Sequence, residues 1–310
     1  MKVIVIHGGV SSERKVSLKS GKVVAESLKN SGHDVILVDI IDSFKYKIKS
    51  KEFNITELKD LDADIVFNAL HGKYGEDGQI QSLLEMMDIK YTGSGILASS
   101  LGMDKLKCYE IVDKFDIDIP KTYEVTTVKE LDYISLPFPL FVKPNDGGSS
   151  IASGVVKDNK ELREMVEKGL ECSKRILIQE VIEGDEYTCP VLGSGGHATV
   201  LPVGLIKTEN TFFDFEAKYE SKGTTETFPA PIDEEQSKII QEIALEVHKI
   251  LGCKGISRSD FIINKDRIVF LEINTSPGMT AQSLCPKSAL AYGLDMPQLL
   301  QRIINDGLNS

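Results

Sequence analysis

The sequence has few of the features that mark several common protein classes. It has only five cysteines, widely spaced and without a Cys-x-x-Cys pair, so we expect neither a disulfide framework nor a zinc site. No apolar run approaches the roughly 20 residues that a membrane helix needs, and the run after Lys2 is too short for the core of a signal peptide. No Walker A loop occurs in the chain. We therefore expect a cytoplasmic protein without membrane insertion.

Positive charge is scarce relative to negative charge. The chain has 36 Lys and Arg against 47 Asp and Glu, which gives a formal net charge of −11. Nucleic acids and anionic membranes favour a basic surface, so we expect neither as a partner. A small anionic ligand held by a few local lysines is compatible with this balance.

Hydrophobic residues make up 41% of the 310 positions, and their pattern predicts three lobes. In the first lobe, short apolar runs alternate with helical spacing, which favours right-handed crossover units and a parallel sheet. We expect the second lobe to begin with one helix over residues 97–115, and the third to contain a strand over residues 199–204. The predicted fold class is α/β and α+β. The lobes are an N-terminal parallel α/β lobe, a small central α+β lobe and a C-terminal mixed-sheet lobe, over residues 1–95, 96–183 and 184–310.

Two glycine-rich loops of the first lobe carry candidate binding residues. The first, residues 7–14, follows the first predicted strand, where glycines let backbone N–H groups face a ligand. Its Glu13 either favours the following helix through its charge or holds a substrate ammonium. The second, residues 70–78, lies at the carboxyl end of a predicted strand, where open α/β sheets bind ligands. His71 is the strongest candidate in this loop.

Two later loops are candidates for contact with phosphates. The Gly-Gly-Ser-Ser sequence at residues 147–150 follows a strand that carries Lys143, and it offers N–H and hydroxyl donors. A hairpin tip without a ligand is the alternative for this loop. Residues 211–219 mix aromatic and charged side chains, a pattern typical of a lid that places Lys218 and Tyr219 over a site. A packed loop would fit the same stretch.

The most informative pattern lies in two predicted strands joined by a short turn. Arg258 and Asp260 share one strand face, as do Glu272 and Asn274 on the next strand. A hairpin centred on Asp266 would place Asp260 opposite Glu272, with Cβ atoms about 4.5–5.5 Å apart. Two carboxylates and an amide oxygen on one face suit Mg²⁺ that carries phosphates, whereas a solvated polar face is the alternative. The loop after Asn274 can turn N–H donors toward an anion.

These motifs occur in the order typical of the D-alanine–D-alanine ligases of the ATP-grasp superfamily, which the chain resembles over nearly its whole length. The matching segments are Gly8-Gly9-x-Ser11-x-Glu13-Arg14, Leu70-His71-Gly72 with Gly75-Glu76-Asp77-Gly78, Tyr91-Thr92-Gly93-Ser94, Met103-Asp104-Lys105, Gly148-Ser149-Ser150, Asp214-Phe215-Glu216-Ala217-Lys218-Tyr219, and Glu272-Ile273-Asn274-Thr275-x-Pro277-Gly278-Met279-Thr280. Any one of them would be weak, but seven in register are specific. The resemblance implies a three-lobed ATP-grasp fold and the ATP-dependent joining of two D-alanines, through a D-alanyl phosphate, for peptidoglycan synthesis.

The same resemblance implies roles for individual residues. Contacts with ATP are implied for Lys105, Lys143, Ser150, Gln179, Glu180, Ile182, Glu186 and Lys218. Two Mg²⁺ or Mn²⁺ ions are implied at Asp260, Glu272 and Asn274. Substrate binding is implied for His71, Ser283 and Leu284, and catalytic roles for Glu13, Ser149, Tyr219, Arg258 and the N–H of Gly278. A homodimer is implied as well.

The chain departs from the family pattern at a few positions. Gln179 replaces a frequent glutamate near adenine, Phe213 and Phe215 stand where tyrosines are common, and Ala152 stands where a glycine often follows the Ser-Ser pair. One alternative is an ATP-grasp ligase with D-lactate, D-serine or an L-amino acid as acceptor. The other is a nucleotide-binding regulator without turnover, and the complete set of Arg258, Asp260, Glu272 and Asn274 argues against it.

Overall fold

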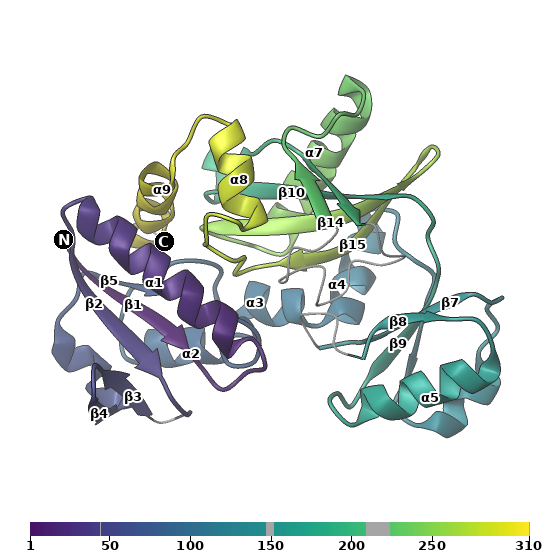
Figure 1. Ribbon diagram of the computed structural model, residues 1–310, viewed down its shortest axis with the longest axis horizontal. Helices are drawn as coiled ribbons and strands as arrows, with labels where there is room; N and C mark the ends of the chain where they lie inside the picture. Colours follow the sequence, from purple (N-terminus) through teal and green to yellow (C-terminus); the bar gives the residue numbers. More distant parts are fainter. Residues whose placement is uncertain (44, 147–151, 209–223, 310) are drawn as a thin grey trace.

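The described residues form three sheets, and the first lies at the N-terminal end of the molecule (Figure 1). The computed structural model describes residues 1–43, 45–146, 152–208 and 224–309. The strand order of this sheet is β4-β3-β2-β1-β5. Its strands are β1 (Lys2–Gly8), β2 (Asp34–Ile40), β3 (Lys45–Ile48), β4 (Lys51–Asn54) and β5 (Ile65–Asn68).

The prediction of a parallel sheet is only partly correct. β1 pairs in parallel with β2 and β5, but β3 is antiparallel to both β2 and β4. Only residues 41–44 separate β2 from β3. A parallel crossover needs a dozen or more residues, so this short connection forces the chain to reverse.

Helices cover both faces of the first sheet because β1 and β5 are buried on both sides. Val3 and Val5 pack with α1 (Arg14–Asn30) and with α9 (Met296–Leu308). Ile4 and Ile6, which alternate with them, pack on the other face. That face is covered by the 3₁₀ helix η1 (Ile55–Leu61) and by α2 (Gln79–Met86).

The prediction of a single helix over residues 97–115 is wrong, because the helical segment is interrupted. The segment is divided into α3 (Ile96–Met103), α4 (Lys105–Val112) and the 3₁₀ turn η2 (Asp113–Phe115). Asp104 interrupts it with an extended ψ of 92°, and its side chain accepts a hydrogen bond from the N–H of Lys107 at 3.0 Å. An aspartate in this position is a favourable N-cap, so α4 starts anew there.

The second sheet is small and antiparallel. It runs in the order β6-β9-β7-β8, and α5 (Asn159–Leu170) and the 3₁₀ segment η3 (Val128–Tyr133) pack against it. Its strands are β6 (Thr122–Val125), β7 (Leu140–Pro144), β8 (Gly154–Val156) and β9 (Ile176–Glu180). α3 and α4 lie between this sheet and the first one in Figure 1.

The third sheet is the largest and runs in the order β13-β12-β10-β14-β15, with β11 paired to β10. α7 (Glu234–Ile250) packs against β10 and β14. The strand predicted over residues 199–204 ends at Val200 instead, because Pro202 has no N–H to give to a ladder. The strands are β10 (Asp185–Leu192), β11 (Thr199–Val200), β12 (Gly204–Thr208), β13 (Thr224–Thr227), β14 (Ile256–Asn264) and β15 (Arg267–Asn274), and a 3₁₀ turn, η4 (Gly195–His197), precedes β11.

The hairpin of β14 and β15 has the expected pairing near its open end but a different centre. Asn264 pairs with Arg267, so the turn consists of Lys265 and Asp266 rather than being centred on Asp266. A β-bulge then shifts the register between Asp260 and Phe261. The extra residue on β15 restores the predicted pairing of Asp260 with Glu272 and of Arg258 with Asn274.

The chain ends by returning to the first sheet. α8 (Leu284–Ala291) and α9 contribute Cys285, Ala289, Leu300 and Ile304 to a core shared with β1, β5 and α1. Figure 1 accordingly shows both termini on the same side of the molecule. No helix in the described ranges has the length and apolar character to cross a bilayer.

Candidate functional site

One face of the large sheet carries a cluster of charged and polar side chains. Asp260 on β14 pairs with Glu272 on β15 and with Thr188 on β10, so the three side chains share a face. Arg258 and Asn274 form the next pair on that face. The opposite face packs with α7 in the hydrophobic core. The sheet therefore presents this cluster on the side away from that core.

Asp260 is firmly held within this cluster. Arg258 donates from Nε to Oδ1 at 2.8 Å and from Nη2 to Oδ2 at 2.7 Å. The Thr188 hydroxyl donates to Oδ1 at 2.7 Å. Asp260 is only 4% exposed, and a bidentate arginine–carboxylate pair is among the strongest of polar contacts. The arrangement is a buried, ordered polar site rather than a solvated polar face.

The oxygen atoms of the cluster suit a hard divalent cation. Two hydrogen bonds occupy Oδ1 of Asp260, whereas Oδ2 accepts one and keeps a second lone pair. Oδ1 of Asn274 accepts from the Ser276 N–H at 2.8 Å and likewise keeps a lone pair. In the described part of the chain, no three His, Cys, Asp or Glu side chains are grouped so that they could hold a metal ion by themselves. An ion here would therefore need the Asn274 amide oxygen beside Asp260 and Glu272.

Two buried lysines approach the same cluster from other elements. Lys105, the first residue of α4, places Nζ 3.6 Å from Oε2 of Glu272. Lys143 on β7 donates from Nζ to the Tyr109 hydroxyl at 3.1 Å. Asn145 joins the two segments, because its backbone oxygen accepts from the N–H of Lys105 at 3.3 Å. The structure therefore brings both predicted phosphate lysines to one region.

The predicted adenine and ribose contacts follow one another along the connection from the small sheet to the large one. Gln179 is buried and donates to Thr122 Oγ1 at 2.8 Å. Oε1 of Glu180 accepts from the Lys121 N–H at 3.1 Å and lies 3.5 Å from Nη2 of Arg267. The remaining candidates are both half-buried: Ile182 lies just before β10, and Glu186 lies at its start.

His71 links the first lobe to the loop that follows β15. Its Nδ1 lies 3.0 Å from the carbonyl oxygen of Ser276 and 3.3 Å from Oε1 of Glu76, and its Nε2 lies 3.1 Å from Ser20 Oγ. Burial alone lowers the pKa of His71. The hydrogen bond and charge of Glu76, the charge of Glu13 and the Ser276 carbonyl outweigh burial and raise that pKa above the usual histidine value. The surroundings of His71 therefore favour its charged form more than water does.

Glu13 lies beside the same histidine loop. It occupies the N-cap position of α1 and is 8% exposed, but its side chain makes no capping hydrogen bond. Gly72 adopts a φ of +70°, and a Cβ there would lie 2.7 Å from Oε2 of Glu13. The Ser11 hydroxyl donates to the carbonyl of His71 at 2.6 Å and accepts from the N–H of Glu13 at 3.2 Å. The two glycine-rich loops are thus in direct contact, as a shared site requires.

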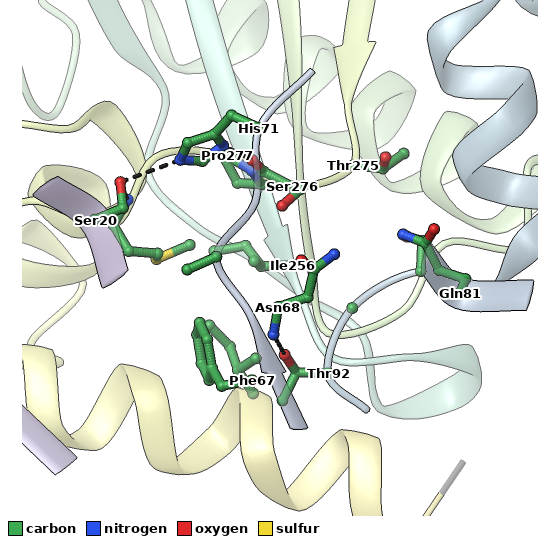
Figure 2. A pocket seen from close by; sticks show the side chains of 15 residues that line it. Ser20, Phe67, Asn68, His71, Gln81, Thr92, Ile256, Thr275, Ser276 and Pro277 are labelled. Atoms are coloured by element: carbon green, nitrogen blue, oxygen red, sulfur yellow. Dashed lines mark hydrogen bonds between the residues drawn. The ribbon is translucent and has the colours of Figure 1, made fainter. Parts of the chain in front are cut away.

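A small pocket adjoins His71 and Ser276 on the side of the first lobe (Figure 2). Its volume of about 20 Å³ leaves room for about one water molecule. Figure 2 shows Asn68, Gln81 and Thr92 around it, together with the Ser20–His71 hydrogen bond. The pocket is too small for a substrate, so it lies behind the site rather than forming it.

Gly278, Ser283 and Leu284 come together where α8 begins. Ser283 is the N-cap residue of α8, and Leu284 is its first residue. The Ser283 hydroxyl accepts from the Thr280 N–H at 3.1 Å. A Cβ at Gly278 would lie 2.9 Å from Ser283 Oγ, so only glycine fits here without a shift of that hydroxyl. N–H groups at a helix start favour an anion such as a carboxylate.

Some predicted residues lie outside the described ranges. These are Ser149 and Ser150 of the serine loop, and Phe213, Phe215, Lys218 and Tyr219 of the predicted lid. Ala152, which follows the serine loop, has a φ of +53°. That conformation is one that glycine adopts at lower cost, so this departure from the family pattern is visible in the backbone.

The sequence analysis missed several residues that hold the site together. Thr188 shares a strand face with Glu186, and strand alternation could have indicated it. Tyr109 lies four residues after Lys105, on the same face of α4, and helical spacing could have indicated it. For Ser20 and Asn145 the sequence gives no such signal, since their contacts join segments far apart in the chain.

Comparisons with known proteins agree with this geometry. Residues 99–305 match the family model described as the D-ala D-ala ligase C-terminus, and residues 49–94 match that of the N-terminus. A D-alanine–D-alanine ligase from Halalkalibacterium halodurans is 38% identical, with 98% of each chain covered. One from Carboxydothermus hydrogenoformans is 40% identical, with 99% of this chain and 98% of that protein covered.

Solved structures are similar over the whole chain. The D-alanine–D-alanine ligase of Bacillus anthracis has a TM-score of 0.83 at 33% identity, covering 100% of this chain and 98% of that one. A D-Ala:D-Ser ligase from Enterococcus faecalis has a TM-score of 0.85 at 33% identity, covering 99% of each chain. These neighbours have the ATP-grasp fold, so the predicted fold is confirmed. The resemblance inferred from the motifs is confirmed as well: the chain belongs to the family of D-alanine–D-alanine ligases.

Proposed function

We propose that this protein joins two D-alanines in an ATP-dependent reaction, through a D-alanyl phosphate, to supply a precursor of peptidoglycan. The observation that carries this proposal is the convergence of three segments. The carboxylates of Asp260 and Glu272, the ammonium of Lys105 and the His71–Ser276 contact all adjoin the carboxyl end of β15. A carboxylate activated at this point would have phosphate-binding groups on one side and a buried Glu13 on the other.

The first half of the reaction needs stabilisation of a transferred phosphoryl group. Phosphoryl transfer depends mostly on positioning and electrostatics, which Lys105 and Lys143 supply as fixed positive charges. Asp260, Glu272 and Asn274 would hold two Mg²⁺ or Mn²⁺ ions, which would neutralise phosphate charge when bound. The donor set fits them, because each of these side chains offers a hard oxygen on one sheet face. Ser150 and Lys218 complete this set by resemblance.

In the second half of the reaction, the amine of the second D-alanine attacks the activated carboxyl of the first. The first D-alanine must therefore stay fixed while its phosphate leaves. Glu13 would hold the ammonium of the first D-alanine, with His71 beside it. Arg258 and the Gly278 N–H would stabilise the tetrahedral oxyanion. Arg258 uses Nε and Nη2 on Asp260, and Nη1 takes part in none of its hydrogen bonds to the described residues, so it could face the reacting carbonyl.

The acceptor would be held at the start of α8. Ser283 and the N–H of Leu284 would bind the carboxylate of the second D-alanine. Ser149 and Tyr219 would orient both substrates together with Glu13. Water must be excluded while the acyl phosphate exists, because hydrolysis competes with attack by the amine.

The nucleotide would lie between the small sheet and the large one. Gln179, Glu180 and Ile182 would contact adenine, partly through backbone groups, and Glu186 would contact the ribose. The side chain of Glu180 is already bonded to Lys121 and Arg267, which favours a contact through its backbone. We place the reaction in the cytoplasm, where ATP is available. The lobe boundaries at residues 95 and 183 are proposed as the limits of the three lobes around the nucleotide.

A phosphate-release assay with ATP, Mg²⁺ and a panel of D- and L-amino acids tests the function. A fixed site that keeps the ammonium on Glu13 leaves no room for the methyl group of an L-amino acid, and overpacking costs about 1–3 kcal/mol. Loss of the ammonium contact adds a similar amount. We therefore expect a preference for D-alanine over L-alanine of about 100-fold or more. Comparable rates with L-alanine would contradict the proposal.

The same panel separates the alternatives. The similarity to a D-Ala:D-Ser ligase makes D-serine the most pertinent rival acceptor, so D-serine and D-lactate are tested against D-alanine. Phosphate release that requires a D-amino acid would exclude a regulator without turnover. We also propose a homodimer, which sedimentation equilibrium would detect as about twice the chain mass of 34.2 kDa.

A further inference from the structure

The β-bulge of the site hairpin leaves one backbone group without its ladder partner. Asp260 pairs with Glu272 and Phe261 with Phe270, so Leu271 is the extra residue on β15. The extra residue of a bulge is left out of the ladder. The hydroxyl of Tyr109 donates to the carbonyl oxygen of Leu271 and so satisfies it. The tyrosine thereby fixes the backbone immediately before Glu272.

The same hydroxyl also contacts a predicted phosphate lysine. Nζ of Lys143 donates to the Tyr109 hydroxyl at 3.1 Å and lies 5.6 Å from the centre of its ring. The Tyr109 hydroxyl therefore donates a hydrogen bond to β15 and accepts one from β7.

Tyr109 is placed for this by α4. It lies four residues after Lys105, so both side chains leave the same helix face. Lys105 reaches Glu272, and Tyr109 reaches Leu271 beside it. The ring is 1% exposed and meets Phe270 edge-on, with centroids 6.3 Å apart. Three elements, α4, β7 and β15, are thus joined through one buried side chain.

We propose that Tyr109 is a positioning residue for phosphoryl transfer, which sets Glu272 through the bulge at Leu271 and holds the ammonium of Lys143. This inference rests on the proposed function, because it concerns the groups that would hold ATP. Tyr109 itself is buried behind them and touches no substrate in this scheme. Misplacement of such groups by about 1 Å can cost about 100-fold in rate, so a residue behind them can control it.

The first test is Tyr109→Phe, which keeps the ring and removes the hydroxyl. Glu272 and Lys143 then lose their common support, and we expect kcat to fall about 10- to 100-fold. The KM for D-alanine should stay unchanged, because Glu13 and Ser283 lie in other segments. The matched control is Tyr46→Phe, since Tyr46 is fully buried in the first lobe and its hydroxyl has no hydrogen-bond partner in the described structure. That control should have wild-type kinetics.

A double variant tests whether the effect passes through Lys143. If Tyr109 acts by holding this lysine, Tyr109→Phe combined with Lys143→Met should lose less activity than the product of the two single losses. A full multiplicative loss would show that the two residues act independently and would overturn that part of the inference.

Site-specific 3,5-difluorotyrosine at position 109 tests the inference while keeping the phenol hydroxyl, because fluorine replaces only two ring hydrogens. Fluorination lowers the phenol pKa, and a phenolate cannot donate to the Leu271 carbonyl. We expect kcat to fall at a lower pH than in the wild type, whereas a ring that only fills space would leave the pH profile unchanged.

The outcomes separate this inference from the proposed function. A wild type that releases no phosphate with D-alanine overturns both. An active wild type, with Tyr109→Phe indistinguishable from Tyr46→Phe and with an unshifted pH profile, overturns the role of Tyr109 alone. A reduced kcat at unchanged KM for D-alanine, together with the shifted profile, supports it.

Discussion

At the scale of single residues, the carboxylate of Glu272 is more exposed than that of Asp260, so a change at Glu272 alters charge with little effect on packing. The side chain is 29% exposed and lies 3.6 Å from Lys105. We expect Glu272→Gln to lower kcat by about 100-fold or more, because one electrostatic group at a transferring phosphoryl is worth that much. Thermal unfolding should be little changed. The measurement is phosphate release at saturating Mg²⁺.

The matched control for that change is Glu110→Gln. Glu110 lies on α4 and pairs with Lys107 at 2.6 Å, but both side chains are at least half exposed. Surface pairs of this kind contribute little, so the control should keep its rate and stability. Near-normal turnover of Glu272→Gln would refute the assignment of Glu272 as a metal ligand.

His71 predicts a pH dependence of stability. Its folded pKa is raised above the unfolded value of about 6.5, so the charged form stabilises the fold fully below that pH. This contribution is lost as the pH rises through the raised folded pKa. The free energy of unfolding of the wild type should therefore exceed that of His71→Gln by more at pH 6 than at pH 9. Urea unfolding at both values measures the difference.

The comparison with a variant isolates His71 from the other buried histidines. Burial lowers the pKa of His7, and it lowers that of His248 to about 4, so these two favour folding at higher pH in both proteins. His197→Gln, a change at an exposed residue, serves as the control. If the free energy of unfolding of the wild type exceeded that of His71→Gln by more as the pH rises, the stabilising role of the His71 charge would be contradicted.

The predicted pairing of Asp260 with Glu272 is correct only because the bulge compensates for the misplaced turn. Without the bulge, the observed turn would place Asp260 opposite Leu271. Strand alternation placed the polar residues on one face near the open end of the hairpin. The bulge lies in Val269-Phe270-Leu271, which is apolar throughout, so no change of phase is visible there. The contact of Tyr109 with Leu271 was unpredictable for the same reason, because it depends on the bulge.

At the scale of elements, the break between α3 and α4 positions Lys105. Asp104 caps α4, accepts from Nδ2 of Asn145 at 2.9 Å and pairs with Arg175. Asp104→Ala removes all three contacts. Loss of the cap alone should lower the free energy of unfolding by about 0.5–2 kcal/mol. Because the helix start carries Lys105, we also expect a higher KM for ATP.

A second N-cap separates stability from function in that experiment. Asp233 caps α7 by accepting from the Gln236 N–H at 2.8 Å, far from the lysines along the chain. Asp233→Ala should cost similar stability in urea unfolding and leave the KM for ATP unchanged. Equal kinetic effects of the two variants would mean that the break at Asp104 has no special role.

Several elements were missed because local sequence signals were weak or contradicted. The helical spacing across residues 97–115 is continuous. The break is stabilised by the N-cap of Asp104 and by its contacts with the distant Asn145 and Arg175. α8 is short and contains Pro286 in its first turn, so its pattern did not indicate a helix. β3 and β4 are strands of only four residues with mostly polar side chains, and β4 forms the sheet edge. Alternation alone does not distinguish such short strands from a loop.

At the scale of the whole molecule, α9 joins the two ends of the chain into one core. Leu300 is fully buried among residues of β1, β5 and α1. We expect Leu300→Ala to lower the free energy of unfolding by about 2–5 kcal/mol, as the removal of a buried leucine side chain does. The control is Leu290→Ala in α8, where the leucine is 67% exposed, and its effect should stay within about 0.5 kcal/mol. Equal effects in urea unfolding would contradict the shared core.

The return of α9 to the first sheet also has a consequence for synthesis on the ribosome. Domains generally fold in order as they emerge, but one face of the first sheet is covered only in part, by α1, until α9 has been made. Nascent chains stalled before Met296 should therefore keep the first lobe sensitive to protease. Chains extended by a C-terminal linker, so that α9 has left the ribosome, should protect it. Protection of residues 1–95 in the shorter chains would show that the lobe folds alone. If the first lobe does not fold alone, the part of the enzyme made first is completed last. Until α9 has been made, its apolar strands then depend on chaperones for protection.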